Sequence, residues 1–224
     1  MNIVYQDNHL IAINKPSGQL VQVDQTGDVS LEMEVKEYIR VTFNKPGEAF
    51  IGVIHRIDRP VSGLVLMART SKALERMNLA FKERKIQKTY YAIVRNQPAQ
   101  EEGRLIHWLT KDSNKNIARA YDKETKDALR SELTYRVLSE NNGFYLLEVK
   151  PITGRTHQIR IQLSKMGCPI VGDNKYGYPR ANKDRSICLH SRSLEFEHPV
   201  TKEKMKIVAE VPNDDFWKKI VTNN

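Results

Sequence analysis

The feature that most constrains the fold is an Asn-Gly pair set between two strand-like segments. Residues 133–138 and 144–149 are rich in apolar residues, and Asn142-Gly143 lies between them. Asn-Gly is favoured in two-residue hairpin turns, because both residues adopt positive φ at low cost. The chain is therefore predicted to contain an antiparallel pair of strands joined by a tight turn at this position.

Other segments show the periodicity of strands or helices. Alternating apolar residues, or short apolar runs between turn residues, predict strands at residues 4–13 (two strands around Asn8), 64–68, 89–94, 189–196 and 205–211. Apolar residues at helical spacing predict helices at 31–41 after an N-cap at Ser30, at 71–84, at 155–166 before Gly167, and in a short terminal segment. Strands outnumber helices, which favours the α+β class: a mixed, mainly antiparallel β-sheet core with flanking helices and loops.

Nothing in the composition divides the 224 residues into parts. There is no repeat, low-complexity tract or break in composition, so we expect a single domain over residues 1–224. Residues 111–131 are almost wholly polar and are predicted to be a solvated excursion from that domain. Cys168 and Cys188 make no disulfide framework and lack the other ligands of a zinc site. We expect them to pack as small residues in a reducing compartment, and we expect no metal.

The charge of the chain points to a polyanionic partner. There are 36 Lys and Arg against 27 Asp and Glu, a formal net charge of +9. A surplus of this size favours nucleic acid first and an anionic membrane second. The N-terminus lacks a basic segment followed by an apolar one, and no apolar run approaches 18 residues. We therefore expect a cytoplasmic protein with no membrane partner.

One short segment, HRIDRPVSGL at residues 55–64, places a carboxylate between two arginines. Nearby guanidinium groups favour the ionised form of Asp58. An ionised carboxylate on a turn can act as a nucleophile, as a base or as a structural ion-pair partner. These three roles stay open at the level of this segment alone.

Three further segments carry the same kinds of side chain. NKPSG at residues 14–18 puts a lysine on a rigid turn, and KTYYA at 88–92 puts aromatic rings on a strand beside a lysine. GRTHQIRIQL at 154–163 supplies two arginines and a histidine where a loop enters a helix. Each segment alone is a weak signal, but the set, in this order, is specific.

With these segments the chain resembles the RluA-type pseudouridine synthases. The matching segments also include TGRTHQIRIQL at 153–163, GDNKYG at 172–177 and LHSRSLEFEHP at 189–199, and the resemblance runs from about residue 3 to about residue 212. It implies a pseudouridine synthase-like fold and an isomerase that converts uridine to pseudouridine in ribosomal or transfer RNA. The reaction involves neither a redox change nor a group donor, so no cofactor is expected.

The resemblance also implies roles for individual residues. Asp58 matches the aspartate on which catalysis depends, and Arg160 the arginine that forms a salt bridge with it. Tyr90 matches the aromatic residue that packs against the target base, and Leu163 the apolar residue that lines its pocket. Arg56 matches an arginine that enters the RNA helix where the base has left it. Further candidate contacts to RNA are Lys15, Arg59, Lys88, Arg155 and His157.

Some features depart from the family pattern. Ile57 stands where we expect Leu, and Val61 where Thr is common, which leaves Asp58 itself untouched. Many relatives carry a separate N-terminal RNA-binding domain, whereas here the catalytic fold is expected to begin at about residue 3. We therefore expect a monomer that recognises RNA through the basic surface of its catalytic domain, with residues 111–131 forming part of it.

Two alternatives are weighed against the isomerase. An RNA-binding or RNA-folding module would have no use for the set of Asp58, Tyr90 and Arg160. A nucleoside hydrolase or glycosidase needs a second carboxylate about 5 to 9 Å from the first. Asp173 is the nearest candidate, but in its Gly-Asp-Asn turn we expect it to cap the backbone. Whether Asp58 attacks C1′ of the ribose or removes a proton from C2′ stays open.

Overall fold

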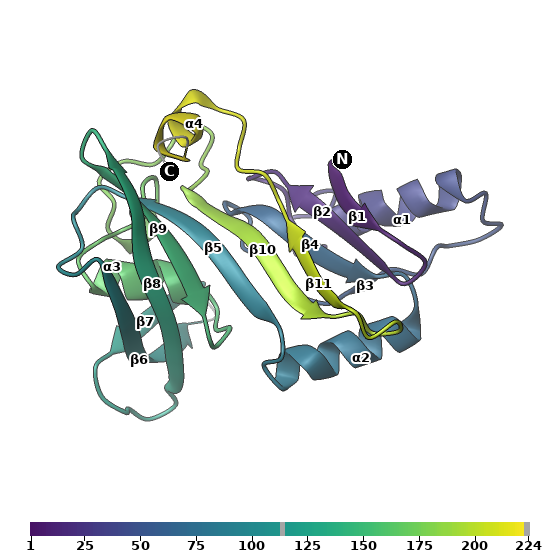
Figure 1. Cartoon of the computed structure of the whole chain (residues 1–224), viewed down its shortest axis with the longest axis horizontal. Coiled ribbons are helices and arrows are strands. Elements are labelled where there is room, and N and C mark those ends of the chain that lie inside the picture. The colour runs from purple at the N-terminus through teal and green to yellow at the C-terminus, as the bar shows by residue number, and fades with distance from the viewer. Residues whose placement is uncertain (113–114, 222–224) are drawn as a thin grey trace. The chain divides into compact units, whose positions relative to one another are not determined.

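The computed structural model describes residues 1–112 and 115–221 (Figure 1). Their contacts separate into two compact units, the first made of Met1–Gln87 and Ser191–Val211, the second of Lys88–His190 and Pro212–Asn224. A single domain over the whole chain stays a prediction. No helix within the described ranges is long and apolar enough to cross a membrane.

The first unit is a sheet with two helices. Its strands are β1 (Ile3–Gln6), β2 (Leu10–Lys15), β3 (Gly52–Val53), β4 (Ser62–Ala68), β10 (Leu189–Glu197, from Ser191 onward) and β11 (Lys204–Val208). They are ordered β1-β2-β4-β10, with β3 beside β4 and β11 beside β10. The helices are α1 (Leu31–Thr42) and α2 (Ser71–Lys82).

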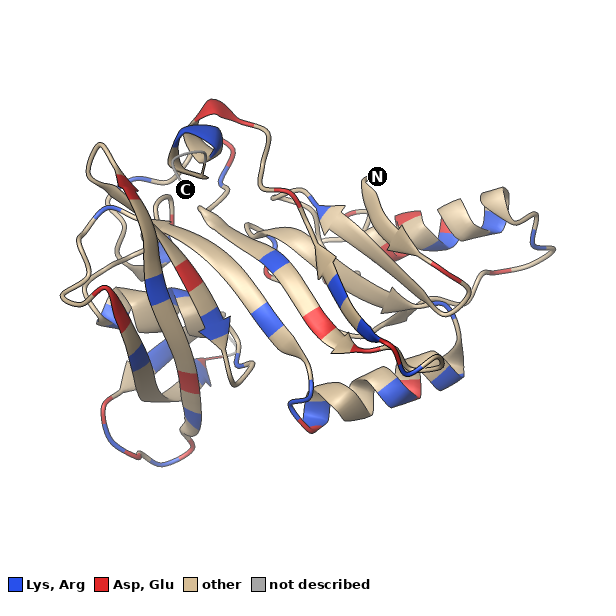
Figure 2. Cartoon of the chain, in the orientation of Figure 1, with Lys and Arg blue, Asp and Glu red and all other residues tan. Residues whose placement is uncertain are grey.

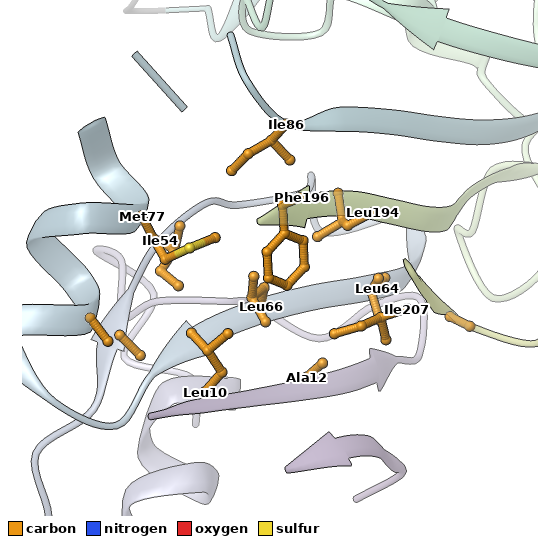
Figure 3. Close-up of a cluster of buried hydrophobic side chains, with 13 residues drawn as sticks. Leu10, Ala12, Ile54, Leu64, Leu66, Met77, Ile86, Leu194, Phe196 and Ile207 are labelled. Atoms are coloured by element: carbon orange, nitrogen blue, oxygen red, sulfur yellow. The ribbon is translucent and has the colours of Figure 1, made fainter. Parts of the chain in front are cut away.

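A cluster of apolar side chains holds this unit together (Figure 3). Leu10 on β2, Leu66 on β4 and Leu194 on β10 are fully buried, and Met77 reaches them from α2. Every residue of β4 is buried, which explains why its sequence is a continuous apolar run. Burial of each large side chain contributes about 1.5–3 kcal/mol, so this cluster fixes the strand that follows the Asp58 loop.

The second unit is an antiparallel sheet with a helix against it. Its strands are β5 (Gln87–Val94, from Lys88 onward), β6 (Glu102–Asp112), β7 (Ile117–Tyr121), β8 (Leu129–Asn141) and β9 (Phe144–Pro151). They are ordered β5-β9-β8-β6-β7. The remaining elements are α3 (Gln158–Lys165), the 3-10 helix η1 (Asn174–Tyr176) and α4 (Asp215–Val221).

The predicted hairpin and the predicted starts of α1 and α2 are confirmed. Asn142 and Gly143 have φ of 53° and 73° and join β8 to β9 as a two-residue turn. The Ser30 hydroxyl accepts a hydrogen bond from the Met33 N–H at 3.4 Å and caps α1. The mainly antiparallel α+β class is confirmed with them.

Two predictions about the second unit are wrong. Residues 111–131 are not one solvated excursion, because β7 lies within them and pairs with β6. Neither of these two strands was predicted. β7 is only five residues long and buries only the small Ala118, so its few apolar residues do not stand out from the polar sequence around it. Helix α3 begins at Gln158 instead of Arg155, because His157 has a left-handed backbone with φ of 54°. The middle of the β6–β7 connection, residues 113–114, lies outside the described residues.

Candidate functional site

Asp58 lies on the loop between β3 and β4 in the first unit. Its carbonyl oxygen accepts a hydrogen bond from the Val61 N–H at 3.0 Å, which closes a tight turn. At the start of the loop, His55 Nε2 accepts from the Leu66 N–H at 3.0 Å, and its ring stacks on Phe81 with centroids 5.2 Å apart. The Asp58 side chain is partly exposed, so the turn presents a carboxylate on a backbone anchored to the core.

Gly63 anchors the other end of the loop. Its φ is 110°, and a Cβ at this position would lie 2.3 Å from the carbonyl oxygen of Ser191. No L side chain fits such an approach, which requires glycine at this place in the segment. The start of β4 is thus held against β10 five residues after Asp58.

Lys15 is a buried side chain that holds the loop in place through hydrogen bonds. It is fully buried, and its Nζ donates to the carbonyl oxygens of Pro16 and Gln19, both at 2.8 Å, and of Arg59 at 3.3 Å. Burial lowers the pKa of Lys15 to about 7, a shift that the nearby Asp58 charge partly opposes. Lys15 was expected to contact RNA, but the structure encloses it and gives its ammonium a structural role beside Asp58.

The two arginines around Asp58 differ in setting. Arg59 is half-exposed; its Nε donates to the carbonyl oxygen of Gly18 at 2.9 Å, and its guanidinium pairs with Asp28 at 2.8 Å. Arg56 is exposed. Arg56 is therefore available to an RNA ligand, whereas Arg59 also ties the loop to the turn after β2.

Arg160 lies on α3 in the second unit and is buried. Its Nε and Nη2 donate to the two carboxylate oxygens of Asp173 at 2.7 and 2.8 Å. Its guanidinium carbon also lies 5.0 Å from the centroid of the Tyr176 ring. The prediction that Asp173 caps the backbone is wrong, since η1 has no side-chain cap and the carboxylate binds Arg160 instead. The pairing of Arg160 with Asp58 stays a prediction.

A hydrogen-bonded network holds the loop that enters α3. The Thr153 hydroxyl donates to Gln158 Oε1 at 2.8 Å, and Gln158 Nε2 donates to the carbonyl oxygen of Glu132 at 3.0 Å. Arg155 on this loop is exposed. The Nζ of Lys88 lies 3.4 Å from where a Cβ on Gly154 would stand. The loop therefore places two of the expected RNA contacts, Lys88 and Arg155, near each other.

His157 is buried rather than displayed to a ligand. Its Nδ1 lies 2.7 Å from the hydroxyl of Tyr176, which accepts a hydrogen bond from the Ala118 N–H at 2.8 Å. The sequence alone offered no reason to link Tyr176 to the site, although GDNKYG contains it. These contacts join the start of α3 to β7 and give His157 a structural role.

Tyr90 and Leu163 come from different elements of the second unit. Tyr90 is partly buried on β5, opposite Val149. Leu163 is fully buried on α3, one turn after Arg160. The described residues contain no group of three or more His, Cys, Asp or Glu side chains placed to hold a metal ion.

The comparisons with known proteins agree on one family. A family model described as RNA pseudouridylate synthase matches residues 9–165. The chain is 32% identical to a protein named tRNA pseudouridine synthase C of Vibrio parahaemolyticus, over 99% of this chain and 94% of that protein. It is 34% identical to a protein named ribosomal large subunit pseudouridine synthase C of Vibrio cholerae, over 92% of this chain and 64% of that protein.

Solved structures agree on the fold. Human RNA pseudouridylate synthase domain containing 4 superposes with a TM-score of 0.80 at 24% identity, over 95% of this chain and 89% of that one. Human RNA pseudouridylate synthase domain containing 1 gives a TM-score of 0.76, also at 24% identity, over 99% and 86% of the two chains. The expected fold is confirmed.

Proposed function

Because the chain belongs to the RNA pseudouridylate synthase family, we propose that its isomerisation of uridine in RNA depends on Asp58. The observation that carries this proposal is the anchoring of the Asp58 turn by Lys15, His55 and Gly63. A reacting group is most effective when its backbone is held by packed residues. The relatives' names refer to transfer and ribosomal RNA, and we propose the same substrates here.

The reaction requires access to a base that is normally stacked. Extrusion of the base costs a few kcal/mol, and the exposed Arg56, two residues before Asp58, is suited to fill the space that the base leaves. Tyr90 would pack against the extruded uracil and keep it from diffusing away while it rotates. Leu163 is proposed to line the pocket for the base. Because Leu163 is fully buried, neighbouring side chains must move before it contacts the base.

Asp58 must be ionised in either route. As a nucleophile it would attack C1′ of the ribose, the glycosidic C–N bond would break, and C5 of the uracil would then displace the carboxylate. As a base it would remove the C2′ proton while the glycosidic C–N bond breaks, and return it after the new C–C bond forms. In both routes the proton on C5 is then released to water and N1 takes up a proton. In both routes Arg160, as the proposed partner of Asp58, stabilises the charged carboxylate.

The contacts of Asp173 weaken the hydrolase alternative. A glycosidase would need a second carboxylate that exchanges protons with substrate or water. Asp173 is buried and both of its oxygens bind Arg160. We therefore expect rearrangement without release of free uracil.

The test is tritium release from RNA labelled at C5 of uridine, with bulk transfer RNA and ribosomal RNA transcripts. Wild type should release tritium from at least one class, and Asp58→Asn from neither. Asp24→Asn is the matched control, since Asp24 is an exposed acid of the same unit. Tight binding without tritium release by wild type would favour an RNA-binding module. We also propose that the protein is a cytoplasmic monomer. Gel filtration with light scattering measures its oligomeric state.

A further inference from the structure

The sheet of the second unit has one buried face and one open face. Successive side chains of a strand point to opposite faces. His107, Leu109 and Leu133 are buried on the face toward α3, whose Gln162 Nε2 donates to the carbonyl oxygen of Leu105 at 3.3 Å. The alternate residues of β6–β9 point away from α3. They include the acids Glu102, Glu132 and Glu148 and a set of cationic and aromatic residues that we call the outer sheet face: Arg104, Trp108, Arg119, Tyr121, Arg130 and Lys150.

Two aromatic residues occupy paired strand positions on this outer sheet face. Trp108 on β6 is directly opposite Tyr121 on β7 and, on its other side, directly opposite Arg130 on β8. Side chains in such cross-strand positions are within contact distance. Both rings are partly exposed. Partly exposed aromatic residues at paired strand positions offer rings on which the bases of single-stranded RNA stack with little dependence on sequence.

The cations beside the rings are held in place by a buried acid. Glu132 binds Arg104 through one carboxylate oxygen and Arg130 through the other. The Glu132 side chain is 4% exposed, whereas those of Arg104 and Arg130 are 60% and 48% exposed. The solvent therefore meets the guanidinium groups and not the carboxylate. Anchored side chains lose less conformational entropy on binding a phosphate.

Arg119 adds a further cation beside the aromatic rings. It is exposed, lies two residues from Tyr121 on β7 and faces Thr110 across the strand pair. Figure 2 shows Lys and Arg along the strands of this unit, interspersed with Asp and Glu. An acidic protein segment could pair with these cations, but it would make no use of Trp108 and Tyr121. The combination of rings and arginines favours RNA.

We propose that the outer sheet face binds a single-stranded segment of the substrate RNA. Bases stack on Trp108 and Tyr121, and the flanking phosphates pair with Arg104, Arg119 and Arg130. The inference rests on the RNA-directed activity proposed above and names a second place where the same RNA is held. Trp108 and Tyr90 point to opposite faces of the sheet by their register, so this surface is distinct from the face that carries Tyr90.

The test uses a fluorescein-labelled oligoadenylate of about 20 nucleotides, long enough for several bound bases. It contains no uridine, so its binding does not depend on catalysis. Fluorescence anisotropy of the full chain should show that Tyr121→Ala and Arg119→Glu each weaken binding by about fivefold or more. Lys72→Glu makes the same change of charge on exposed α2 residue Lys72 and should alter binding by less than about twofold. Lys72→Glu should also keep the wild-type kcat on a short labelled stem-loop.

Three results would overturn the proposal. Wild-type affinity in both Tyr121→Ala and Arg119→Glu would exclude this surface. An equal loss of affinity in Lys72→Glu would show that the effect comes from the net charge of the protein. Arg119-dependent binding of poly-glutamate without Arg119-dependent binding of oligoadenylate would assign the surface to an acidic protein. Thermal melting verifies that each variant is folded. Arg119→Gln replaces Arg119→Glu if that variant melts at a lower temperature than wild type. Absence of tritium release in wild type would contradict the proposed function and leave the oligoadenylate result standing.

Discussion

At the scale of single residues, Lys15 and Asp173 do the most to position the charged groups of the site. Lys15 joins the turn after β2 to the Asp58 loop through three carbonyl oxygens. Asp173 holds the buried guanidinium of Arg160 through both carboxylate oxygens. Each is a positioning residue, because it acts on the substrate through the residue that it fixes.

Replacement of Lys15 by methionine should destabilise the first unit. The carbonyl oxygens of Pro16 and Gln19 would lose a buried donor, which costs about 3 kcal/mol in total. Urea unfolding of wild type and Lys15→Met measures this loss, with Lys72→Met as the exposed control. A Lys15→Met protein as stable as wild type would contradict the structural role.

The same pair of proteins should differ in pH dependence. Burial lowers the pKa of Lys15 to about 7 in the folded chain, against 10.5 as its ordinary value. Between these values the unfolded chain binds more protons, so wild-type stability rises with pH. The stability difference between wild type and Lys15→Met should therefore grow by about 2 kcal/mol from pH 7 to pH 9. A difference that is flat or falls over this range would show that Lys15 is buried in its charged form.

Asp173→Asn should lower kcat more than it weakens RNA binding. The amide keeps the shape of the carboxylate but leaves the buried Arg160 charge without its full countercharge. We expect kcat to fall about tenfold or more, while the Kd for substrate RNA changes by less than about threefold. Single-turnover tritium release and anisotropy measure the two quantities, and Asp122→Asn is the exposed control. An equal fall of kcat in Asp122→Asn would contradict this role. So would weaker RNA binding with an unchanged kcat in Asp173→Asn.

At the scale of elements, the sequence predicted most strands but misjudged those whose buried side is small. β4 was predicted because it is buried on both faces and reads as an apolar run. β7 was not, because it is only five residues long, its buried residue is the small Ala118, and the sequence around it is polar. The site motifs were found through resemblance, but the Arg160–Asp173 pair was not, since residues 13 apart across a loop carry no distance information in the sequence.

Gly63 offers the sharpest test of how the elements hold the site. A methyl group there would meet the Ser191 backbone at 2.3 Å on a backbone with φ of 110°, so Gly63→Ala should cost about 3 kcal/mol or prevent folding. Gly47→Ala is the matched control, because a Cβ at Gly47 would have no other atom within 4 Å. Urea unfolding compares the two. Equal stability of Gly63→Ala and Gly47→Ala would mean that β4 and β10 tolerate separation.

At the scale of the whole molecule, the net charge of +9 predicts that binding to RNA weakens with salt. Each phosphate contact to a single strand contributes about −0.7 to the slope of log affinity against log salt. Removal of one contact on the outer sheet face by Arg119→Gln should therefore make the slope shallower by about 0.7. Anisotropy with oligoadenylate between about 50 and 200 mM salt measures it. An unchanged slope would exclude Arg119 as a phosphate contact.

The most direct measurement of the central claim compares chemistry with binding in Asp58→Asn. Single-turnover tritium release and the Kd for the same RNA are measured side by side for wild type, Asp58→Asn and Asp24→Asn. We predict that Asp58→Asn loses all measurable conversion while its Kd stays within about tenfold of wild type, and that Asp24→Asn matches wild type in both. Substantial conversion by Asp58→Asn would contradict the assignment of the reaction to Asp58.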